Sequence, residues 1–458
     1  MNDLLAILTL DPNSDTMTHV NWSTRVQTEL AHHIQQIRMV DTHEHLQSES
    51  EWLDTKPDIL QDLFGNYVPA DLHTAGASSS SIQQLMDKSN ADLEQRFNSI
   101  RAAWEATQFT GYGEAVRLIA KSIYGIDEIT TGSLIENQHK ASDFCQSGER
   151  LRLLSEVANL DHVQTDNFCW PCLPDLSGIN FFLYDLSWAD FCNGQVDLSA
   201  IHSTVGIEVS DLDSLEHAMS AIFAKYAPVA IAVKSQHAYN RTLNWSPRTS
   251  DDASQALDLI LTNSHDQVEV QTRLCLGDWA WAKGLELAAQ YRLPFKIHTG
   301  YYAGNDRMPV SRISAGNMCE LLASFPETQF VLMHTAYPYS QELIALAKHY
   351  RNVWVDLCWA WSIDPFSSID FLRRFIHAVP INKLFAFGGD TRWPTSAVAY
   401  SIQARQCIEK ALTAEIDEGY LTEKQALFVA EKVMYDNQYE CFDIIETRSN
   451  IQAIVASD

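Results

Sequence analysis

The sequence predicts an α/β protein in which eight parallel strands and their helices close into a distorted (β/α)8 barrel, the TIM barrel. Two observations lead to this prediction. Short apolar runs rich in β-branched and aromatic residues alternate with stretches of helical periodicity, and eight such runs can be counted. Most runs are continuously apolar, as expected for parallel strands that are covered on both faces. The chain has 458 residues, 46% of them hydrophobic, which is enough for one large barrel with a sizeable core.

The eight expected strands follow one another along most of the chain. They are 37–46, 162–168, 179–185, 229–234, 294–299, 329–335, 352–358 and 383–390. Between them, periodicity predicts helices at 211–226, with Ser210 as the N-cap, at 278–291 and at 339–350. Only about ten residues separate the second strand from the third, which leaves no room for a crossover helix, so the barrel is expected to be distorted there.

Two long segments lie outside this repeating pattern. Residues 47–158 follow the first strand, are mostly helical and are rich in Trp, Tyr and Arg, so we expect a helical insertion that covers the mouth of the barrel. Residues 395–446 predict a run of helices on the outside of the barrel. No linker rich in proline, glycine or serine marks the exit of the insertion, and residues 1–458 are therefore expected to form one domain.

The net charge argues against several kinds of partner. With 32 basic and 59 acidic residues, the chain carries −27, so a general surface for nucleic acid or for anionic membranes is not expected. An anionic substrate would need a local cationic pocket. No apolar run is long enough for a membrane span, and residues 1–15 lack the basic start and the cleavage pattern of a signal peptide.

The cysteines favour a reducing cytoplasm and no disulfide framework. Nine cysteines are scattered along the chain. Cys169 and Cys172 form a close pair, but no second pair is present to complete a zinc knuckle. We therefore expect this pair to lie in a loop beside a strand.

Histidine, lysine and carboxylate side chains stand at the ends of the expected strands. The first strand contains Asp41 and ends in His43-Glu44-His45, where alternation places both histidines on one face and Glu44 on the other. Taken alone, this pair does not decide between a metal site and an ordinary strand end, because the chain holds 16 histidines. The fourth, fifth, sixth and eighth strands end in Lys234, His298, His334 and Asp390. All of these lie at the carboxyl face, where barrel enzymes place their catalytic groups, so together they predict a divalent-metal site.

Five stretches of the sequence carry a resemblance to a known family. They are VDTHEHL (40–46), VKSQHAYNRTL (233–243), KIHTGYYAGND (296–306), VLMHTAYPYS (331–340) and FAFGGDTRWP (385–394). As a set they resemble the amidohydrolase superfamily, in particular the branch that holds metal-dependent decarboxylases, uronate isomerases and the amidohydrolase-like domain attached to some glutamine-synthetase-like proteins. The resemblance extends from the first expected strand to the end of the eighth and is weaker through 47–160.

The resemblance implies a metal ion bound by His43, His45, His298 and Asp390. In members with one ion, the histidine that matches His334 handles protons or the substrate oxygen. In members with two ions, a carboxylated lysine at the position of Lys234 bridges them and that histidine becomes a ligand. The spacing from Lys234 through Tyr239 to Arg241 resembles the branch in which the lysine contacts substrate, so one ion is favoured over two. Nitrogen and oxygen ligands suit Zn²⁺ and, less specifically, Mn²⁺, Fe²⁺ or Co²⁺.

These parts predict a hydrolase. A divalent cation lowers the pKa of bound water to about 7, Asp390 can move the proton from that water to a leaving group, and His334 can polarise a carbonyl oxygen. The water would attack a C–N or C–O bond of a small, carboxylated substrate. Arg241, with Tyr239 beside it, could bind the substrate carboxylate, and Arg392 and Arg307 are weaker candidates. Each arginine could instead form an ion pair within the protein.

The same site allows other reactions. Decarboxylation of an aromatic or enol acid and aldose–ketose isomerisation of a sugar acid are the alternatives, and the run Gly388–Arg392 resembles the corresponding turn of uronate isomerases. A barrel that binds metal and ligand without turnover is less expected, because no proposed ligand is missing. Trp359 and Trp361 could wall the pocket or pack under the loops. The resemblance also allows a homo-oligomer.

Overall fold

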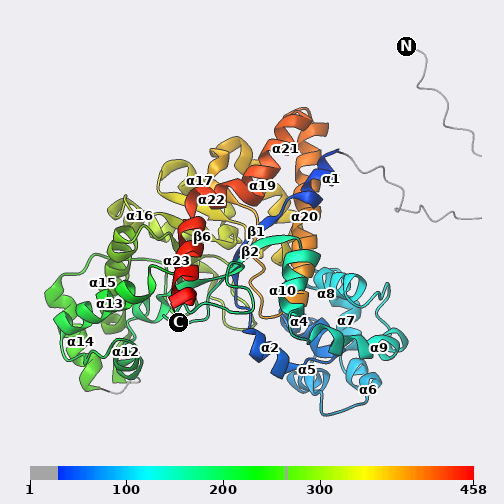
Figure 1. Ribbon diagram of the computed structural model, residues 1–458, viewed down its shortest axis with the longest axis horizontal. Coiled ribbons are helices and arrows are strands. Elements are labelled where there is room, and N and C mark those ends of the chain that lie inside the picture. The colour runs from blue at the N-terminus through cyan, green and yellow to red at the C-terminus, as the bar shows by residue number, and fades with distance from the viewer. Residues whose placement is uncertain (1–28, 264–266, 458) are drawn as a thin grey trace, which may run out of the picture.

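Eight parallel strands form one sheet in the order of the chain, which is the arrangement of a TIM barrel (Figure 1). The computed structural model describes residues 29–263 and 267–457. The strands are β1 (Met39–Glu44), β2 (Leu160–Thr165), β3 (Phe182–Ser187), β4 (Ala230–Ser235), β5 (Phe295–His298), β6 (Phe330–Met333), β7 (Val353–Asp356) and β8 (Leu384–Phe385). All eight predicted strands are confirmed, although β8 is much shorter than the predicted 383–390.

The barrel closes between its last and first strands through the segment that follows β8. Backbone hydrogen bonds run from Thr42 to Phe387 (3.0 Å), from Asp390 to His43 (2.9 Å) and from His45 to Thr391 (3.0 Å), donor named first. The segment 386–391 therefore runs beside β1 although it lies outside β8 proper. This pairing is what brings Asp390 next to the two histidines of β1.

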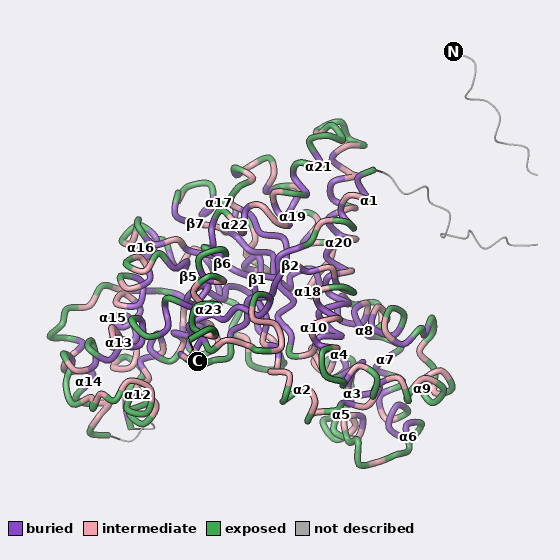
Figure 2. Tube along the Cα trace, in the orientation of Figure 1, coloured by how far each residue is buried: buried purple, intermediate pink, exposed green. Residues whose placement is uncertain are grey.

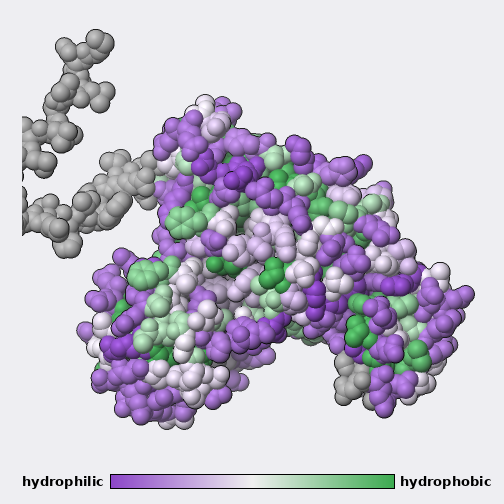
Figure 3. All heavy atoms as spheres, turned by 180° about the vertical axis from the view of Figure 1, so that it is seen from behind, coloured by the Kyte–Doolittle hydropathy of each residue, from purple (hydrophilic) through white to green (hydrophobic). Residues whose placement is uncertain are grey.

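The strands are buried, as their continuously apolar sequences predict. Every residue of β1, β3 and β4 is buried, and the strands lie at the centre of the molecule while the exposed segments lie at its edges (Figure 2). Seen from behind, the surface is mostly hydrophilic, and its hydrophobic atoms lie in small, scattered groups (Figure 3).

The insertion after β1 is helical, as predicted, and forms a lobe beside the barrel (Figure 1). Its α-helices are α2 (Glu49–Thr55), α3 (Ile59–Phe64), α4 (Val68–Thr74), α5 (Ser79–Met86), α6 (Leu93–Asn98), α7 (Arg101–Thr107), α8 (Gly111–Ser122), α9 (Thr131–Asn137) and α10 (Glu149–Arg152). Buried hydrogen bonds join it to α20 (Pro394–Asp417), the helix after β8: Thr395 donates to Asp62 (2.5 Å) and Gln403 donates to Gly111 O (3.1 Å). These bonds fix the insertion against the barrel wall next to the end of β8.

The predicted helix 211–226 is confirmed as α13 (Leu212–Tyr226), but its N-cap is Asp211 and not Ser210. The Asp211 carboxylate accepts a hydrogen bond from Ser214 N–H at 2.9 Å. In return, the Ser214 hydroxyl accepts a hydrogen bond from Asp211 N–H, which completes a capping box. Both candidates are good capping residues, and the aspartate is the one whose side chain reaches the third helical residue.

Two other predicted helices are confirmed with different boundaries. α17 (Ser340–His349) agrees with 339–350, whereas α15 (Val270–Gln290) begins eight residues before the predicted start at Asp278. The aspartate is not a cap: its buried carboxylate receives hydrogen bonds from Arg241 and Arg248. An acid that looks like a helix start in the sequence is therefore a partner for buried arginines.

The C-terminal helices cover the outside of the barrel, as predicted for 395–446, and extend further. After α20 come α21 (Glu423–Glu431), α22 (Asn437–Cys441) and α23 (Ile444–Ser457). Helices without a matching sequence prediction are α1 (Glu29–Gln36), α11 (Ala189–Cys192), α12 (Leu198–Val205), α14 (Ser250–Thr262), α16 (Cys319–Ser324), α18 (Ala360–Ile363) and α19 (Pro365–Ala378).

The connection between β2 and β3 has no helix, as its length predicts. It contains Cys169, which is exposed, and Cys172, which is buried, and both are free thiols in a loop. Across the described part of the chain, no helix is both long enough and apolar enough to cross a membrane. The prediction about a signal peptide concerns residues 1–15, which lie outside the described residues, and the cytoplasmic location stays a prediction.

Candidate metal centre

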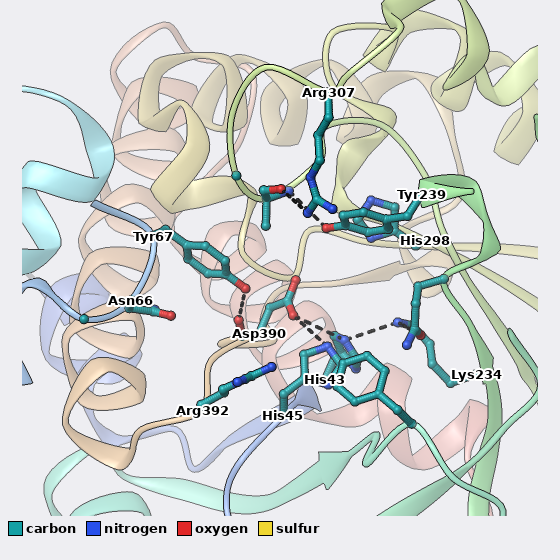
Figure 4. Close-up of a pocket in the computed structure, with 15 residues that line it drawn as sticks. His43, His45, Asn66, Tyr67, Lys234, Tyr239, His298, Arg307, Asp390 and Arg392 are labelled. Atoms are coloured by element: carbon teal, nitrogen blue, oxygen red, sulfur yellow. Dashed lines mark hydrogen bonds and ion pairs between the residues drawn. The ribbon is translucent and has the colours of Figure 1, made fainter. Parts of the chain in front are cut away.

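The carboxyl ends of the strands meet in a cavity of about 460 Å³ at the mouth of the barrel (Figure 4). Its floor and walls include His43, His45, Lys234, His298 and Asp390. The loop between α3 and α4 of the insertion contributes Gly65, Asn66 and Tyr67. The insertion thus covers the barrel mouth at this point, as the sequence predicts.

Two histidines and one carboxylate converge at the centre of this cavity. Asp390 Oδ1 lies 3.4 Å from His43 Nε2 and 3.3 Å from His45 Nε2, and the three ligand atoms lie within 4.8 Å of one another. We call these three residues the His43 cluster. Two ligands that each lie about 2.0–2.1 Å from a tetrahedral ion are roughly 3.3 Å apart. The spacing and the donor types of the cluster therefore fit a divalent metal ion.

His43 and His298 are held in the neutral form that binds metals. Burial, and secondarily the charge of Lys234, lowers the pKa of His43 well below its usual range and that of His298 to about 3. The ring of His45 is oriented by its other nitrogen. Nδ1 lies 2.7 Å from the carbonyl oxygen of Asp166, which can only accept, so Nδ1 carries the proton and Nε2 presents its lone pair to the cluster.

His298, the fourth predicted ligand, lies beside the His43 cluster but outside it. It lines the cavity, and its Nε2 lies 3.0 Å from Tyr301 O, so that nitrogen donates and Nδ1 is left as the acceptor. The centre of its ring lies 4.4 Å from that of His334. The structure brings three of the four predicted ligands to ligand spacing and places the fourth in the same cavity wall.

His334 is buried behind the cavity and does not line it. Its Nε2 lies 3.9 Å from Asp390 Oδ2, and within the described residues neither ring nitrogen has a hydrogen-bond partner. Burial lowers the pKa of its imidazole well below the usual range. His334 is predicted to handle protons or to polarise a substrate oxygen, whereas in the structure it does not line the cavity.

Lys234 contacts a metal-site histidine. Its ammonium nitrogen lies 3.2 Å from His43 Nε2 and 3.4 Å from Gln236 Oε1, and its side chain is almost completely buried. It also lines the cavity, which agrees with the predicted position at the end of the fourth strand.

Arg241 is predicted to bind substrate, but the structure places it outside the cavity wall. Its guanidinium forms a 2.6 Å ion pair with the buried carboxylate of Asp278 and donates to Cys192 O (3.0 Å) and Asn244 O (2.8 Å). These partners use the donors that a substrate carboxylate would need. Arg241 is thus a structural residue that ties the loop after β4 to α15.

Tyr239, Arg307 and Arg392 do line the cavity (Figure 4). The phenol oxygen of Tyr239 accepts a hydrogen bond from Ala303 N–H at 3.0 Å, and its ring lies 4.7 Å from that of His298. Arg307 donates to Ala303 O at 2.8 Å and lies over the Tyr239 ring. The guanidinium of Arg392 has no ion pair within the described residues. Two of the three arginines considered from the sequence therefore remain available to a substrate.

A layer of buried carboxyl groups below the cavity holds the turn that carries Asp390. Glu44 points away from the histidines, as predicted, and its Oε2 accepts from Thr391 N–H at 2.6 Å. Asp41 Oδ1 accepts from the N–H groups of His43 (3.1 Å) and Gly389 (3.3 Å). Asp41 therefore supports the site from below.

Three further side chains near the cavity have no clear counterpart in the sequence analysis. The Tyr67 hydroxyl donates to Asp390 O, and its position in an insertion gives no sequence signal of that contact. Phe168, which is 52% exposed, stacks on the His45 ring at 4.3 Å. Cys358 lies with His334 and Asp390, one ligand atom of each being within 4.8 Å of the others. Cys358 could have been recognised as a site residue from the sequence, because it is the last residue of the predicted seventh strand.

The tryptophans after β7 pack beneath the loops and do not wall the cavity. Trp359 packs against Tyr67, with ring centres 4.2 Å apart, and Trp361 donates from its indole nitrogen to Ala386 O at 2.7 Å. Both are buried and neither lines the cavity. Of the two roles that the sequence allows, the structure shows packing.

Residues 256–437, which include β5 to β8 with His298, His334 and Asp390, match the family model for amidohydrolases. This match covers 182 of the 458 residues and agrees with the resemblance to the amidohydrolase superfamily. This superfamily is metal-dependent, and the His43 cluster is the candidate site for the ion. Protein fluG of Emericella nidulans is 27% identical over 232 residues, which are 48% of this chain. The chain spans only 26% of the length of that relative.

Solved structures of two isomerases share the fold over most of the chain. Uronate isomerase from Thermotoga maritima gives a TM-score of 0.76 at 14% identity, with 90% of this chain and 96% of that chain covered. Glucuronate isomerase from Caulobacter crescentus gives 0.74 at 15% identity, with 90% and 92% covered. At these identities the likeness shows the fold, which is the predicted TIM barrel.

Proposed function

We propose that the chain is a hydrolase that uses one divalent metal ion, Zn²⁺ in the first place, to cleave a C–N or C–O bond of a small, carboxylated substrate. The observation that carries this proposal is the placement of Asp390. Its Oδ1 is shared by the imidazoles of His43 and His45, while Oδ2 faces His334 at 3.9 Å. One carboxylate oxygen is thus available to a metal ion, and the other is free to take up and release a proton.

The charge of the cavity supports an anionic substrate. Lys234, Arg307 and Arg392 line it with positive charge, against the single carboxylate of Asp390. This is the local cationic pocket that an anion would require in a chain of net charge −27. A volume of about 460 Å³ suits a small molecule. Arg392, whose guanidinium forms no ion pair within the described part of the chain, is the residue that we expect to hold the carboxylate in two parallel hydrogen bonds.

The residues around the ion would divide the chemistry among them. A bound Zn²⁺ supplies a Lewis acid and lowers the pKa of water at the site to about 7. Asp390 accepts the proton that the water loses and delivers it to the leaving group. The Tyr67 hydroxyl, bonded to Asp390 O, fixes the backbone of that residue. Phe168 covers His45 on the solvent side and limits access of bulk water.

Isomerisation of a sugar acid is the second candidate function. The observation that favours it is that the fold of two uronate isomerases matches 90% of this chain, a share that includes most of the helical insertion. In that reaction Asp390 would move a proton between neighbouring carbon atoms, and no water would be consumed. The same cationic groups would bind the substrate carboxylate.

An activity panel separates these functions. Zn²⁺-loaded protein is incubated with N-acyl amino acids, lactones, hydroxybenzoates and uronates, and products are identified by mass spectrometry. Amine or hydroxy-acid release from the first two classes is the expected result. Release of carbon dioxide, or conversion of a uronate into its keto isomer with no hydrolysis, would eliminate the hydrolase. Turnover that survives complete removal of transition metals would eliminate the metal-dependent mechanism as a whole.

The variant Asp390→Asn tests the proton-transfer role. The amide keeps an oxygen for the metal ion but cannot accept a proton, so we expect turnover to be abolished while metal content, measured by mass spectrometry, is largely retained. Asp258→Asn, an exposed acid on α14, is the matched control and should leave both unchanged. Full activity in Asp390→Asn would remove Asp390 from this role.

A further inference from the structure

Three buried side chains from the ends of β6, β7 and β8 form a second group behind the His43 cluster. One ligand atom each of His334, Cys358 and Asp390 lies within 4.8 Å of the other two. We call these residues the Cys358 cluster. Asp390 belongs to both clusters, since its Oδ1 faces the β1 histidines and its Oδ2 faces His334. The carboxylate therefore separates two groups of metal-ligand atoms.

The His334 imidazole is the strongest indication that the Cys358 cluster binds something. The residue is 0% exposed, and within the described residues neither of its ring nitrogens has a hydrogen-bond partner. Buried polar groups in proteins are nearly always satisfied, so such a group calls for a ligand. Nε2 lies 3.9 Å from Asp390 Oδ2. A cation between these two atoms would satisfy both.

The electrostatics of the surroundings favour a cation. Asp41, Glu44 and Asp356 are completely buried around the strand ends, in addition to Asp390. Several buried carboxyl groups with few buried cations are costly unless a positive charge is added.

The nearby lysines do not remove this excess. Lys296 is engaged in an ion pair with Asp185 at 2.8 Å, and Lys234 contacts His43. Within the described residues, neither Asp41 nor Glu44 forms an ion pair, and Lys296 and Lys234 act on Asp356 only through space, so the strand ends remain suited to a divalent ion.

The Cys358 side chain is held in position by its neighbours. Its N–H donates to Asp356 Oδ1 at 2.8 Å, and a Cβ at Gly388 would lie only 2.8 Å from its sulfur, so the thiol is packed against that glycine. The φ angles of His334, Cys358 and Asp390 are +66°, +47° and +51°, in the left-handed region that such residues rarely adopt. All members of the cluster thus share an unusual backbone that aims them at one point.

We propose that the Cys358 cluster binds a second divalent cation with affinity for thiolate, such as Zn²⁺ or Co²⁺. Imidazole nitrogen, thiolate sulfur and carboxylate oxygen make three protein ligands with one position left open, an arrangement that both ions accept. Binding breaks the S–H bond of Cys358 and releases its proton to solvent as the metal–sulfur bond forms. The site differs from a two-metal centre bridged by a carboxylated lysine, because Lys234 contacts His43 and is not part of it.

A cation bound at this site would affect catalysis, and this part of the inference rests on the proposed function. An ion in the Cys358 cluster would engage Asp390 Oδ2, the oxygen that we assign to proton transfer. Excess Zn²⁺ is therefore expected to inhibit the wild-type enzyme and to spare Cys358→Ser. If no substrate is found, the binding experiment below still tests the site itself, so failure of the proposed function and failure of this inference are distinguishable.

Cobalt binding tests the site directly. Metal-free protein is titrated with Co²⁺. The thiolate-to-cobalt charge-transfer absorption is recorded in the near ultraviolet, and the amount of metal bound per chain is measured by mass spectrometry. We expect the wild-type protein to show the charge-transfer absorption. Cys358→Ser should lack this absorption and should bind one equivalent of Co²⁺ fewer per chain. Cys407→Ser is the matched control, because Cys407 is also a buried free cysteine but lies in α20. It should behave as wild type.

The same titration can overturn the proposal. A wild-type protein without the charge-transfer absorption, or a Cys358→Ser protein that keeps it, contradicts the site. His334→Gln provides a second variant in case Cys358→Ser does not fold, and it should weaken Co²⁺ binding in the thiolate site at least tenfold. Unchanged absorption and affinity in His334→Gln would equally refute the cluster.

Discussion

Replacing Gly389 with alanine tests how the turn that carries Asp390 is held. The residue lies between β8 and Asp390 and is buried against the Glu44 side chain. A Cβ added here would overlap Glu44 Oε1 and would lie 2.9 Å from Glu44 Cδ. Because Glu44 is completely buried and its carboxylate also accepts from Thr391 N–H at 2.6 Å, it has little room to move away. We therefore expect the alanine to displace either the carboxylate or the turn.

The size of the effect follows from these contacts. Losing the bond to Thr391 leaves a buried donor unsatisfied, at about 1–3 kcal/mol, and forcing a methyl group into a packed site costs about 1–3 kcal/mol. The loss of unfolded-chain freedom on Gly→Ala offsets about 0.4–1 kcal/mol of this. The free energy of unfolding should fall by roughly 2–5 kcal/mol. Metal affinity should fall by about 10–100-fold, as is typical when a group that orients a ligand is disturbed.

Urea denaturation of metal-free protein measures the first effect, and competition with a chromophoric chelator measures the second. Gly132→Ala, in the exposed first turn of α9 where a Cβ would find only ordinary space, is the matched control and should keep metal affinity while gaining about 0.4–1 kcal/mol of stability. Glu44→Asp shortens the clashing side chain, so in the double variant the loss should be smaller than the sum of the single losses. Stability and metal affinity both unchanged in Gly389→Ala would refute this reasoning.

Two further predictions test the structure away from the metal. Arg241→Met should lower the free energy of unfolding, measured by urea denaturation, by about 3 kcal/mol, because it leaves the buried carboxylate of Asp278 with one arginine partner fewer. The KM from steady-state kinetics should stay unchanged. A raised KM with normal stability would instead show that Arg241 binds substrate. Burial raises the pKa of Asp62 from 3.8 to about 6, so the folded protein retains a proton that the unfolded chain loses, and wild-type stability should fall as pH rises from about 4 to about 6. The substituted side chain of Asp62→Asn cannot titrate. Between pH 4 and pH 7 the free energy of unfolding of this variant should therefore rise relative to that of wild type by up to about 3 kcal/mol, at about 1.4 kcal/mol per pH unit. A constant difference between the two free energies across this range, from urea denaturation, would contradict the raised pKa of Asp62.

The strands were predictable because burial on both faces leaves a signal in the sequence itself. In the run 229–234 every residue before Lys234 is apolar, and β4 (Ala230–Ser235) matches that run to within one residue. Helix starts were less predictable, since Ser210 and Asp211 are both good caps and only the fold decides which side chain reaches Ser214. Asp278 shows the same difficulty. An aspartate is typical of a helix start, but this one accepts hydrogen bonds from Arg241 and Arg248, and a local sequence pattern does not reveal those partners.

The site was predictable only to the extent that strand ends determine it. His43, His45 and Asp390 converge because residues at the carboxyl ends of parallel strands share one face of the barrel. Beyond the strand ends, position along the chain says little about direction. Arg241 follows β4 closely yet turns to Asp278, whereas Arg392 lies two residues after Asp390 and lines the cavity. Such choices depend on loops and on partners distant in sequence.

The strand ends place the ligands, but the backbone just beyond them orients the side chains. His334, Cys358 and Asp390 all adopt positive φ, and a non-glycine residue in a sparsely populated region costs about 1–3 kcal/mol. Strain of this kind persists only where the surrounding structure enforces it, and here the bonds of Asp356 to Cys358 N–H and of Glu44 to Thr391 N–H do so. The backbone thus holds the ligand atoms close together at a cost in stability. A bound cation offsets that cost, because the same atoms then gain a partner without further rearrangement.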